Sequence, residues 1–282
     1  MIMNKIIIWG IFIAIACITC VYSCGKEQKS TTNDDTTEQV KPWNISILCD
    51  LSDRITKEST GMCQVEKDTT IVSEIVSILK DKILKNKITQ SEDKIKLYFY
   101  PSPSDTSINK ISKQLDIDFS KIEKGKKRKV LQTINDNFKN SLSHIYTKSL
   151  EEKKWIGCDI FGFFDTGKAQ QYCVKDGYRN VLVILSDGFI FHKDNKNKDG
   201  NKYSYILPQT LRVPNSQLLP CKAIVGDLEV MFLEVNANPK QSKRINEILS
   251  TWFNEMQINK YQIADTDLPG NTSEIIRTFL ED

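Results

Sequence analysis

Oxygen-bearing side chains directly follow two apolar runs of this sequence. Asp50 and Ser52 come after the run 43–49, and Asp187 comes after the aliphatic run 181–185. Runs of this kind are typical of buried parallel strands, and the carboxyl ends of such strands meet at one edge of a sheet. We therefore expect these side chains to converge at that edge, which we call the rim, where they could bind a cation or a charged group.

Further polar residues are expected at the same level. Gly157, Cys158 and Asp159 precede a predicted helix that runs from residue 159 to about residue 174. Polar residues that end central strands or precede helices at the switch point of a doubly wound sheet are the usual ligand-binding positions. The complete set of candidate rim residues is Asp50, Ser52, Asp53, Arg54, Cys158, Asp159 and Asp187.

The elements that must position these residues follow an alternating order. Short apolar runs alternate with segments of helical period, which predicts an α/β fold with a doubly wound, mostly parallel sheet and helices on both faces. We expect strands over 43–49, 95–100, 181–185, 228–235 and 261–264, an antiparallel edge strand over 115–119, and helices over 71–83 (capped by Asp68 or Thr69), 127–150, 245–256 and 273–280.

The segment 188–227 breaks this alternation. Its apolar residues at 189–191 and 203–206 flank a polar turn, so we expect an inserted hairpin followed by a loop. The turn begins like a calcium-binding loop, but Ile206 stands where the bidentate glutamate would be. An ordinary turn is therefore the better interpretation.

Over residues 43–282 the sequence resembles the von Willebrand factor A domain. The metal-ion-dependent adhesion site of that family uses Asp-x-Ser-x-Ser after the first strand, a threonine before a helix and an aspartate after the central strand. The resemblance implies a bound Mg²⁺, which prefers six oxygen ligands and leaves one position for an acidic side chain of a protein partner. Asp50, Ser52 and Asp187 match the pattern, whereas Arg54 replaces the second serine and Cys158 replaces the threonine.

These two departures make the expected metal site degenerate, because a guanidinium repels Mg²⁺ and a thiol suits it badly. In one outcome Asp53 or Asp159 supplies a replacement oxygen, Arg54 turns to solvent and a weak Mg²⁺ site survives. In the outcome we favour, Arg54 folds inward and its charge takes the place of the cation beside Asp50 and Asp187. In a third, Asp50 and Ser52 only cap the following turn.

The first segment carries the features of a targeting signal. An apolar stretch from residue 6 to residue 22 follows Lys5 and ends at Cys24, which resembles the lipobox of bacterial lipoproteins. The resemblance implies a signal peptide over 1–23, a lipid anchor with palmitate among its acyl chains on Cys24, and a flexible tether over 24–40 before a domain over 41–282. The alternative is a short membrane-spanning helix.

Composition excludes several classes of function. The formal net charge of +3 argues against a nucleic-acid partner, and the two histidines leave little room for histidine-based catalysis or zinc sites. We find neither a Walker loop nor a Gly-x-Gly-x-x-Gly motif, so phosphate and dinucleotide binding are not indicated. We expect no enzymatic activity and no certain cofactor; Mg²⁺ at the degenerate site is the one candidate.

Two further features lie outside the rim set. Cys63 and Cys221 could both overhang the rim, and a disulfide between them would fix the insertion there. A basic run over 121–129 precedes the long helix and could contact anionic lipid head groups, although a solvated turn is the simpler interpretation.

The sequence thus predicts a membrane-anchored, extracytoplasmic protein-binding module, periplasmic or surface-exposed, with a protein partner in the cell envelope or on the cell surface. A metal- or aspartate-dependent envelope hydrolase that uses Asp50, and a structural lipoprotein with an inert rim, are the alternatives.

Overall fold

The computed structural model of the protein describes residues 41–59, 61–152 and 157–282. The expected signal peptide over 1–23, the anchor Cys24 and the tether over 24–40 lie outside the described residues. Residues Lys41–Asp282 form one compact unit. The whole sheet and both hydrophobic cores are contained in this unit, so it has the composition of a self-sufficient folding domain.

A six-stranded sheet forms the centre of the unit. Every neighbouring pair is parallel except for the last one, where β5 is an antiparallel edge strand. The fold class predicted from the sequence is therefore confirmed. In spatial order the strands are β13 (Tyr261–Asp265), β12 (Leu228–Val235), β7 (Arg179–Leu185), β1 (Trp43–Cys49), β4 (Lys94–Tyr98) and β5 (Asp116–Asp118).

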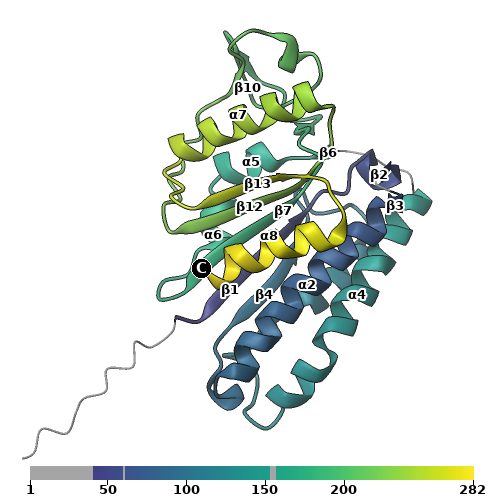
Figure 1. Cartoon of the computed structure of the whole chain (residues 1–282), viewed down its shortest axis with the longest axis vertical. Helices are drawn as coiled ribbons and strands as arrows, with labels where there is room; N and C mark the ends of the chain where they lie inside the picture. The colour runs from purple at the N-terminus through teal and green to yellow at the C-terminus, as the bar shows by residue number, and fades with distance from the viewer. Residues whose placement is uncertain (1–40, 60, 153–156) are drawn as a thin grey trace, which may run out of the picture. The chain divides into compact units, whose positions relative to one another are not determined.

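Helices cover both faces of the sheet (Figure 1). One face carries α2 (Gln64–Lys85), α3 (Thr106–Ser112), α4 (Lys127–Glu152) and α8 (Pro269–Glu281), and the other carries α5 (Ile160–Asp165), α6 (Lys168–Cys173) and α7 (Pro239–Glu255). Short 3₁₀ helices lie at η1 (Asp53–Thr56), η2 (Ile88–Gln90), η3 (Lys113–Leu115) and η4 (Thr210–Arg212).

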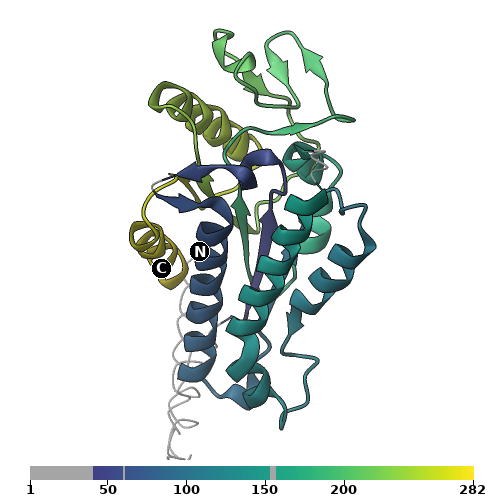
Figure 2. The same ribbon diagram turned by 90° about the vertical axis from the view of Figure 1, so that its right-hand side faces the viewer.

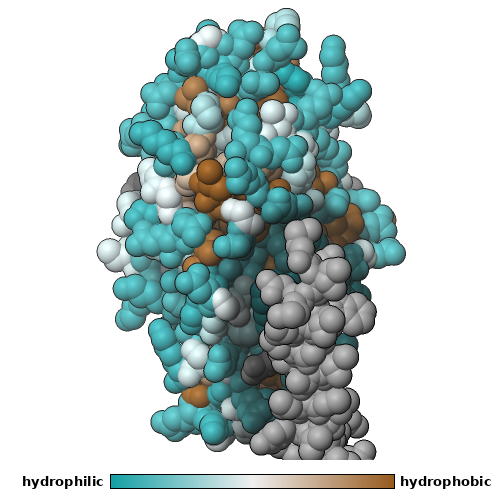
Figure 3. Space-filling view, turned by 90° about the vertical axis from the view of Figure 1, so that its left-hand side faces the viewer, coloured by the Kyte–Doolittle hydropathy of each residue, from teal (hydrophilic) through white to brown (hydrophobic). Residues whose placement is uncertain are grey.

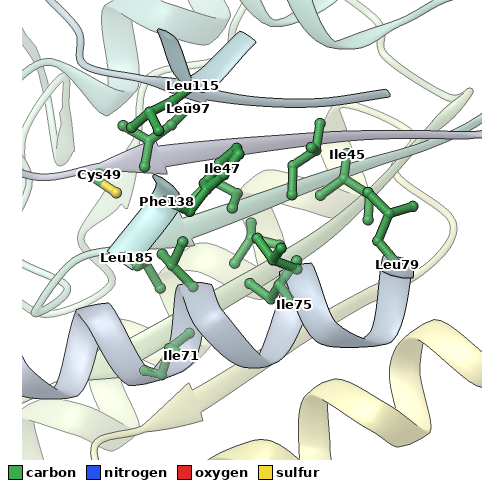
Figure 4. Close-up of a cluster of buried hydrophobic side chains, with 14 of the residues drawn as sticks. Ile45, Ile47, Cys49, Ile71, Ile75, Leu79, Leu97, Leu115, Phe138 and Leu185 are labelled. Atoms are coloured by element: carbon green, nitrogen blue, oxygen red, sulfur yellow. The ribbon is translucent and has the colours of Figure 1, made fainter. Parts of the chain in front are cut away.

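The two cores follow from the two-residue period of the strands. Ile45 and Ile47 point to the side of α2 and α4, where they meet Ile75 and Phe138 (Figure 4), whereas Leu48 packs into the core beneath α7. Because both faces of the central strands are buried, their sequences are continuous apolar runs. The same property made them recognisable in the sequence.

Helix α2 begins earlier than the sequence predicted. It starts at Gln64, directly after the short strands β2 (Glu58–Ser59) and β3 (Met62–Cys63), so Asp68 and Thr69 lie inside the helix and do not cap it. The helix predicted from residue 159 to about 174 is divided into α5 and α6 at Gly167, whose φ of 72° does not fit a continuous helix.

The insertion contains a hairpin, but its arms differ from the predicted ones. Strand β9 (Lys198–Asp199) pairs with β10 (Lys202–Tyr203), which also pairs with β11 (Gln217–Leu218). The predicted first arm instead supplies β8 (Phe191–His192), which pairs with β6 (Gly157–Cys158). The hairpin is tighter because a two-residue turn at Gly200 and Asn201 joins its arms.

The topology reverses between β1 and β7. From β1 the chain crosses over α2 to β4, and from β7 it continues on the other side to β12. The register places Cys49 beside Leu185, and the Asp50 backbone N–H donates to the Leu185 carbonyl at 3.0 Å. Asp50 and the residues after Leu185 therefore leave the sheet side by side, at its switch point.

Within the described part of the chain, no helix combines the length and the hydropathy needed to span a bilayer.

Candidate functional site

The carboxylate of Asp50 is buried and fully engaged by groups of the protein. One oxygen accepts the backbone N–H of Ser52 at 2.8 Å, and the other accepts the hydroxyl of Ser186 at 3.0 Å. Asp50 is 1% exposed. Burial raises the pKa of Asp50; the guanidinium of Arg54 opposes this shift, and the charge of Asp187 adds to it. The hydrogen bond from Ser186, the residue before Asp187, joins the ends of β1 and β7 at one site.

Arg54 folds inward from η1 rather than toward solvent, and it is 1% exposed. Its Nε donates to the Asp50 carbonyl at 3.1 Å and lies 3.9 Å from the Asp50 carboxylate. Its strongest contact is with Asp68, at 2.5 Å between Nη2 and Oδ2. Burial alone would lower the pKa of Arg54, but the acidic groups around it, with Asp68 contributing most, together raise that pKa, so the guanidinium is a permanent cation beneath the rim.

Asp68 links this cation to two neighbouring elements. The hydroxyl of Tyr146, on α4, donates to one Asp68 oxygen, and the amide of Gln64 donates to the other at 2.9 Å. The sequence predicts Asp68 as a helix cap and places Tyr146 within the helix over 127–150 without a polar role. Both are instead buried members of the charge network, because α2 starts at Gln64 and not at residue 71.

Lys57 holds the second rim carboxylate. Its Nζ lies 2.9 Å from Oδ2 of Asp187, whose other oxygen accepts the backbone N–H of Phe189 at 3.1 Å. The Lys57 side chain is 44% exposed, while that of Asp187 is 8% exposed. The cation beside Asp187 is therefore Lys57 and not Arg54, and it remains within reach of solvent.

Cys158 and Asp159 have structural partners. Burial raises the pKa of the Cys158 thiol well above its ordinary value, and the charge of Asp50 adds to the shift. A protonated thiol is a poor metal ligand. The Asp159 carboxylate caps α5 by accepting the Gly162 N–H at 2.7 Å, and the same oxygen accepts the Asn195 amide at 2.7 Å. Asp159 thus connects α5 with the insertion.

The two remaining rim candidates differ in exposure. Ser52 is half-buried and contributes its backbone N–H to Asp50, while Asp53 is exposed on η1. Of the candidate residues, Asp53 is the one that a partner can reach most directly.

A second buried polar group continues the network along the same edge of the sheet, where Leu233 of β12 lies beside Leu185 of β7. Glu234 has a φ of 73°, an unusual value for a residue with a side chain, where the pairing of β12 with β13 changes register. Its carboxylate accepts the Thr266 hydroxyl at 2.8 Å and the Gln64 amide at 3.2 Å, with Lys67 at 3.9 Å. Gln64 therefore bridges the Asp68 and Glu234 carboxylates.

The donor set does not fit a hydrated Mg²⁺. Both oxygens of Asp50 already accept hydrogen bonds, Asp187 is paired with Lys57, and a guanidinium stands where the second hydroxyl ligand belongs. Among the described residues, no group of three or more His, Cys, Asp and Glu side chains is arranged to hold an ion. Two fixed cations instead neutralise the carboxylates that would hold the metal.

The disulfide considered between Cys63 and Cys221 is not formed, and the five cysteines in the described part of the chain are free thiols. Cys63 is exposed at the start of α2, whereas Cys221 packs against the core beneath α7. The two residues belong to different parts of the fold, and the insertion is held by non-covalent contacts such as the bond from Asn195 to Asp159 and the pairing of β8 with β6.

Comparisons with known proteins give distant structural matches. The chain is similar to the pilus adhesin SpaC of Lactobacillus rhamnosus GG, with 16% identity and a TM-score of 0.42 over 87% of this chain and 30% of the adhesin. The open conformation of SpaC matches with 14% identity and a TM-score of 0.42 over 86% of this chain and 30% of the adhesin. It is also similar to BatB of Bacteroides thetaiotaomicron, with 11% identity and a TM-score of 0.40 over 85% of this chain and all of that one. The chain thus spans less than a third of the adhesin. No family model and no curated protein matches it.

Proposed function

We propose that this chain is a lipid-anchored protein of the bacterial cell envelope that binds a protein partner through its rim without a metal ion. The observation that carries the proposal is a pair of cations at the rim. Arg54 pairs with Asp50 and Asp68, and Lys57 pairs with Asp187. In an adhesion site that uses Mg²⁺, the ion receives an acidic side chain of the partner. Here Lys57, which is part exposed, can receive such a carboxylate directly.

The hydrogen bonds of the Asp50 carboxylate support binding of a partner rather than catalysis. Asp50 is buried and both its oxygens are held by Ser52 and Ser186, so its carboxylate is not free to act as a nucleophile. A phosphatase assay with a generic substrate tests the hydrolase alternative. Turnover by the parent protein that is lost in Asp50→Asn would favour that alternative over our proposal.

The partner-binding claim is tested by photo-crosslinking in the cell envelope. A photoreactive amino acid is placed at position 53, which is exposed at the rim, and in a control protein at position 87, which is exposed at the opposite end of the sheet. We expect a discrete crosslinked species from position 53 alone. It should persist with a metal chelator and weaken when Lys57→Glu reverses the charge that meets the partner.

Other outcomes would contradict the proposal. Equal crosslinking from positions 53 and 87, or none from position 53, would favour an inert rim. Loss of the crosslink with the chelator would show that a metal ion is required after all.

The anchoring claim rests on Cys24 and its preceding apolar stretch. Labelled palmitate should be incorporated into the parent chain and not into Cys24→Ser, which should be released from the membrane fraction. Membrane retention of Cys24→Ser without label would instead favour an uncleaved spanning helix.

A further inference from the structure

Basic side chains gather at the end of the sheet opposite the rim. They lie on the start of the described chain, on the carboxyl end of α2 with the segment after it, and on the connection from β5 to α4. We call residues 41, 81–94 and 118–129 the basic pole. It contains the basic residues Lys41, Lys82, Lys85, Lys87, Lys94, Lys121, Lys124, Lys126, Lys127, Arg128 and Lys129, and the acidic residues Asp81, Glu92, Asp93, Asp118 and Glu123.

This excess of positive charge is local. The basic pole contains eleven basic and five acidic residues, whereas the whole chain has 39 basic and 36 acidic residues. Outside this pole the chain therefore carries more acidic than basic residues. The positive charge is concentrated in these three segments and does not reflect a generally basic protein.

Direct contacts hold the three segments together as one surface. Lys82 donates to the backbone carbonyl of Lys41 at 3.4 Å and pairs with Asp93, whose own carbonyl accepts the backbone N–H of Phe119 at 3.0 Å. Lys127 is buried at the start of α4 and donates to backbone oxygens at η2. Figure 2 shows the ends of α2 and α4 together at one end of the unit, away from β2 and β3 at the rim.

The acids of the basic pole leave part of its charge free. Asp93 is paired with Lys82, and Asp118 with Lys94. In contrast, five exposed basic side chains make no ion pair with another described residue: Lys85, Lys87, Lys124, Arg128 and Lys129. The side of the domain shown in Figure 3, which is opposite to that of Figure 2, is mostly hydrophilic with separate small hydrophobic areas.

The chain enters the domain at this pole. Lys41 lies two residues before the start of β1, and Cys24 lies 17 positions earlier in the sequence. A flexible chain of that length has a root-mean-square span of about 20–25 Å. An anchor on Cys24 would therefore hold the basic pole close to the bilayer and at a high effective concentration.

We propose that the basic pole binds the anionic lipid head groups of the membrane to which the chain is anchored. The proposal rests on the anchor in the proposed function and adds an orientation to it. The rim lies at the opposite end of the parallel strands, so docking of the basic pole points the rim away from the membrane and toward a partner. Each basic residue near an anionic surface strengthens binding by about fivefold, and salt weakens the attraction.

Vesicle binding by the domain without its anchor tests this directly. Residues 41–282, whose fold is checked by circular dichroism, are mixed with vesicles of phosphatidylcholine alone or with phosphatidylglycerol. The charge-reversed variant is Lys124→Glu/Arg128→Glu/Lys129→Glu. The matched control, Lys193→Glu/Lys240→Glu/Lys243→Glu, changes the net charge equally at exposed positions elsewhere on the domain.

We expect binding to the anionic vesicles at low salt, no binding to neutral vesicles, and a loss of roughly a hundredfold or more in the charge-reversed variant but not in the control. Equal losses in both variants, or equal binding to neutral vesicles, would overturn the proposal. So would tighter binding to a DNA duplex than to the vesicles. Because this experiment involves neither Cys24 nor the rim, its failure is distinguishable from failure of the proposed function.

Discussion

The guanidinium of Arg54 lies 2.5 Å from the carboxylate of Asp68, in a contact that is almost completely shielded from water. Arg54 follows the first strand by five residues, and Asp68 lies in the second turn of α2. The arginine is thereby held beneath the rim, within 3.9 Å of the Asp50 carboxylate. A residue that would repel a metal ion has become the cation of the site itself.

Arg54→Met should destabilise the domain by about 3–5 kcal/mol, because it leaves Asp68 buried without its cation. Arg54→Met/Asp68→Leu should recover part of this loss, since the double variant buries no unpaired charge. Urea unfolding measures both free energies. Arg277→Met, which removes an exposed arginine paired with Glu74, is the control and should change stability little. A small effect of Arg54→Met would show that the contact is not formed.

Tyr146→Phe should destabilise the domain by about 1–2 kcal/mol, because the change removes the hydroxyl that donates to Asp68 and leaves a buried carboxylate oxygen short of a partner. The aromatic ring stays, so packing against α2 is preserved. In the Asp68→Leu background, Tyr146→Phe should lower the free energy of unfolding by less than it does in the parent protein. An unchanged unfolding midpoint in Tyr146→Phe would contradict the assignment of Asp68 as the centre of the network.

Glu234 should make the domain less stable as pH rises. Burial raises its pKa above the ordinary value of 4.5, so the folded state keeps a proton that the unfolded state has already lost. The free energy of unfolding therefore falls as pH rises from about 4.5 through the pKa in the folded state. Glu234→Gln lacks this contribution, and its unfolding free energy should fall less over that window. Parallel pH profiles of the two proteins would disprove the prediction.

Asn195→Ala should loosen the insertion without unfolding the sheet. It removes the side chain that binds the Asp159 carboxylate, and Asp159 still caps α5 through Gly162. Hydrogen exchange should quicken in residues 193–206 and stay unchanged in β1 and β7. Asn259→Ala, at an exposed position outside the insertion, is the control. Faster exchange throughout the domain would mean that Asn195 has a global role.

The thiols should react in the order of their exposure. Cys63 is exposed, whereas Cys173 is buried and its pKa is raised by burial to about 12. Alkylation of the folded protein should therefore label Cys63 first and spare Cys173 until the protein unfolds. The intact mass of the purified domain should not change on reduction. A mass increase on reduction would reveal a disulfide that the structure does not contain.

The sheet could be predicted from the sequence because its central strands are buried on both faces. The runs 43–49 and 228–235 coincide with β1 and β12, and the alternating segment 115–119 contains the edge strand β5. The insertion was predicted less well, since its strands have two residues each and leave no periodic pattern. Short strands of this kind are fixed by tertiary contacts such as the pairing of β8 with β6.

The candidate site was predicted in part for a similar reason. The placement of Asp50 and Asp187 follows from strand order, which the sequence indicates. The partners of those carboxylates do not follow from it, because Arg54 meets Asp68 only once the start of α2 is known, and Lys57 meets Asp187 across 130 residues. The sequence identifies the polar residues in the loop after β1, but the orientation of their side chains depends on the packing of α2 and α4.

Calorimetric titration with Mg²⁺ and Mn²⁺ tests most directly whether fixed cations replace the metal at the rim. The parent domain should give no saturable heat at millimolar metal, and Lys57→Ala/Arg54→Ser, which frees Asp187 and restores a hydroxyl ligand beside Asp50, should gain binding. Circular dichroism shows whether the variant is folded, and Lys57→Ala alone provides a milder test at Asp187. Saturable binding of either ion by the parent would contradict the account.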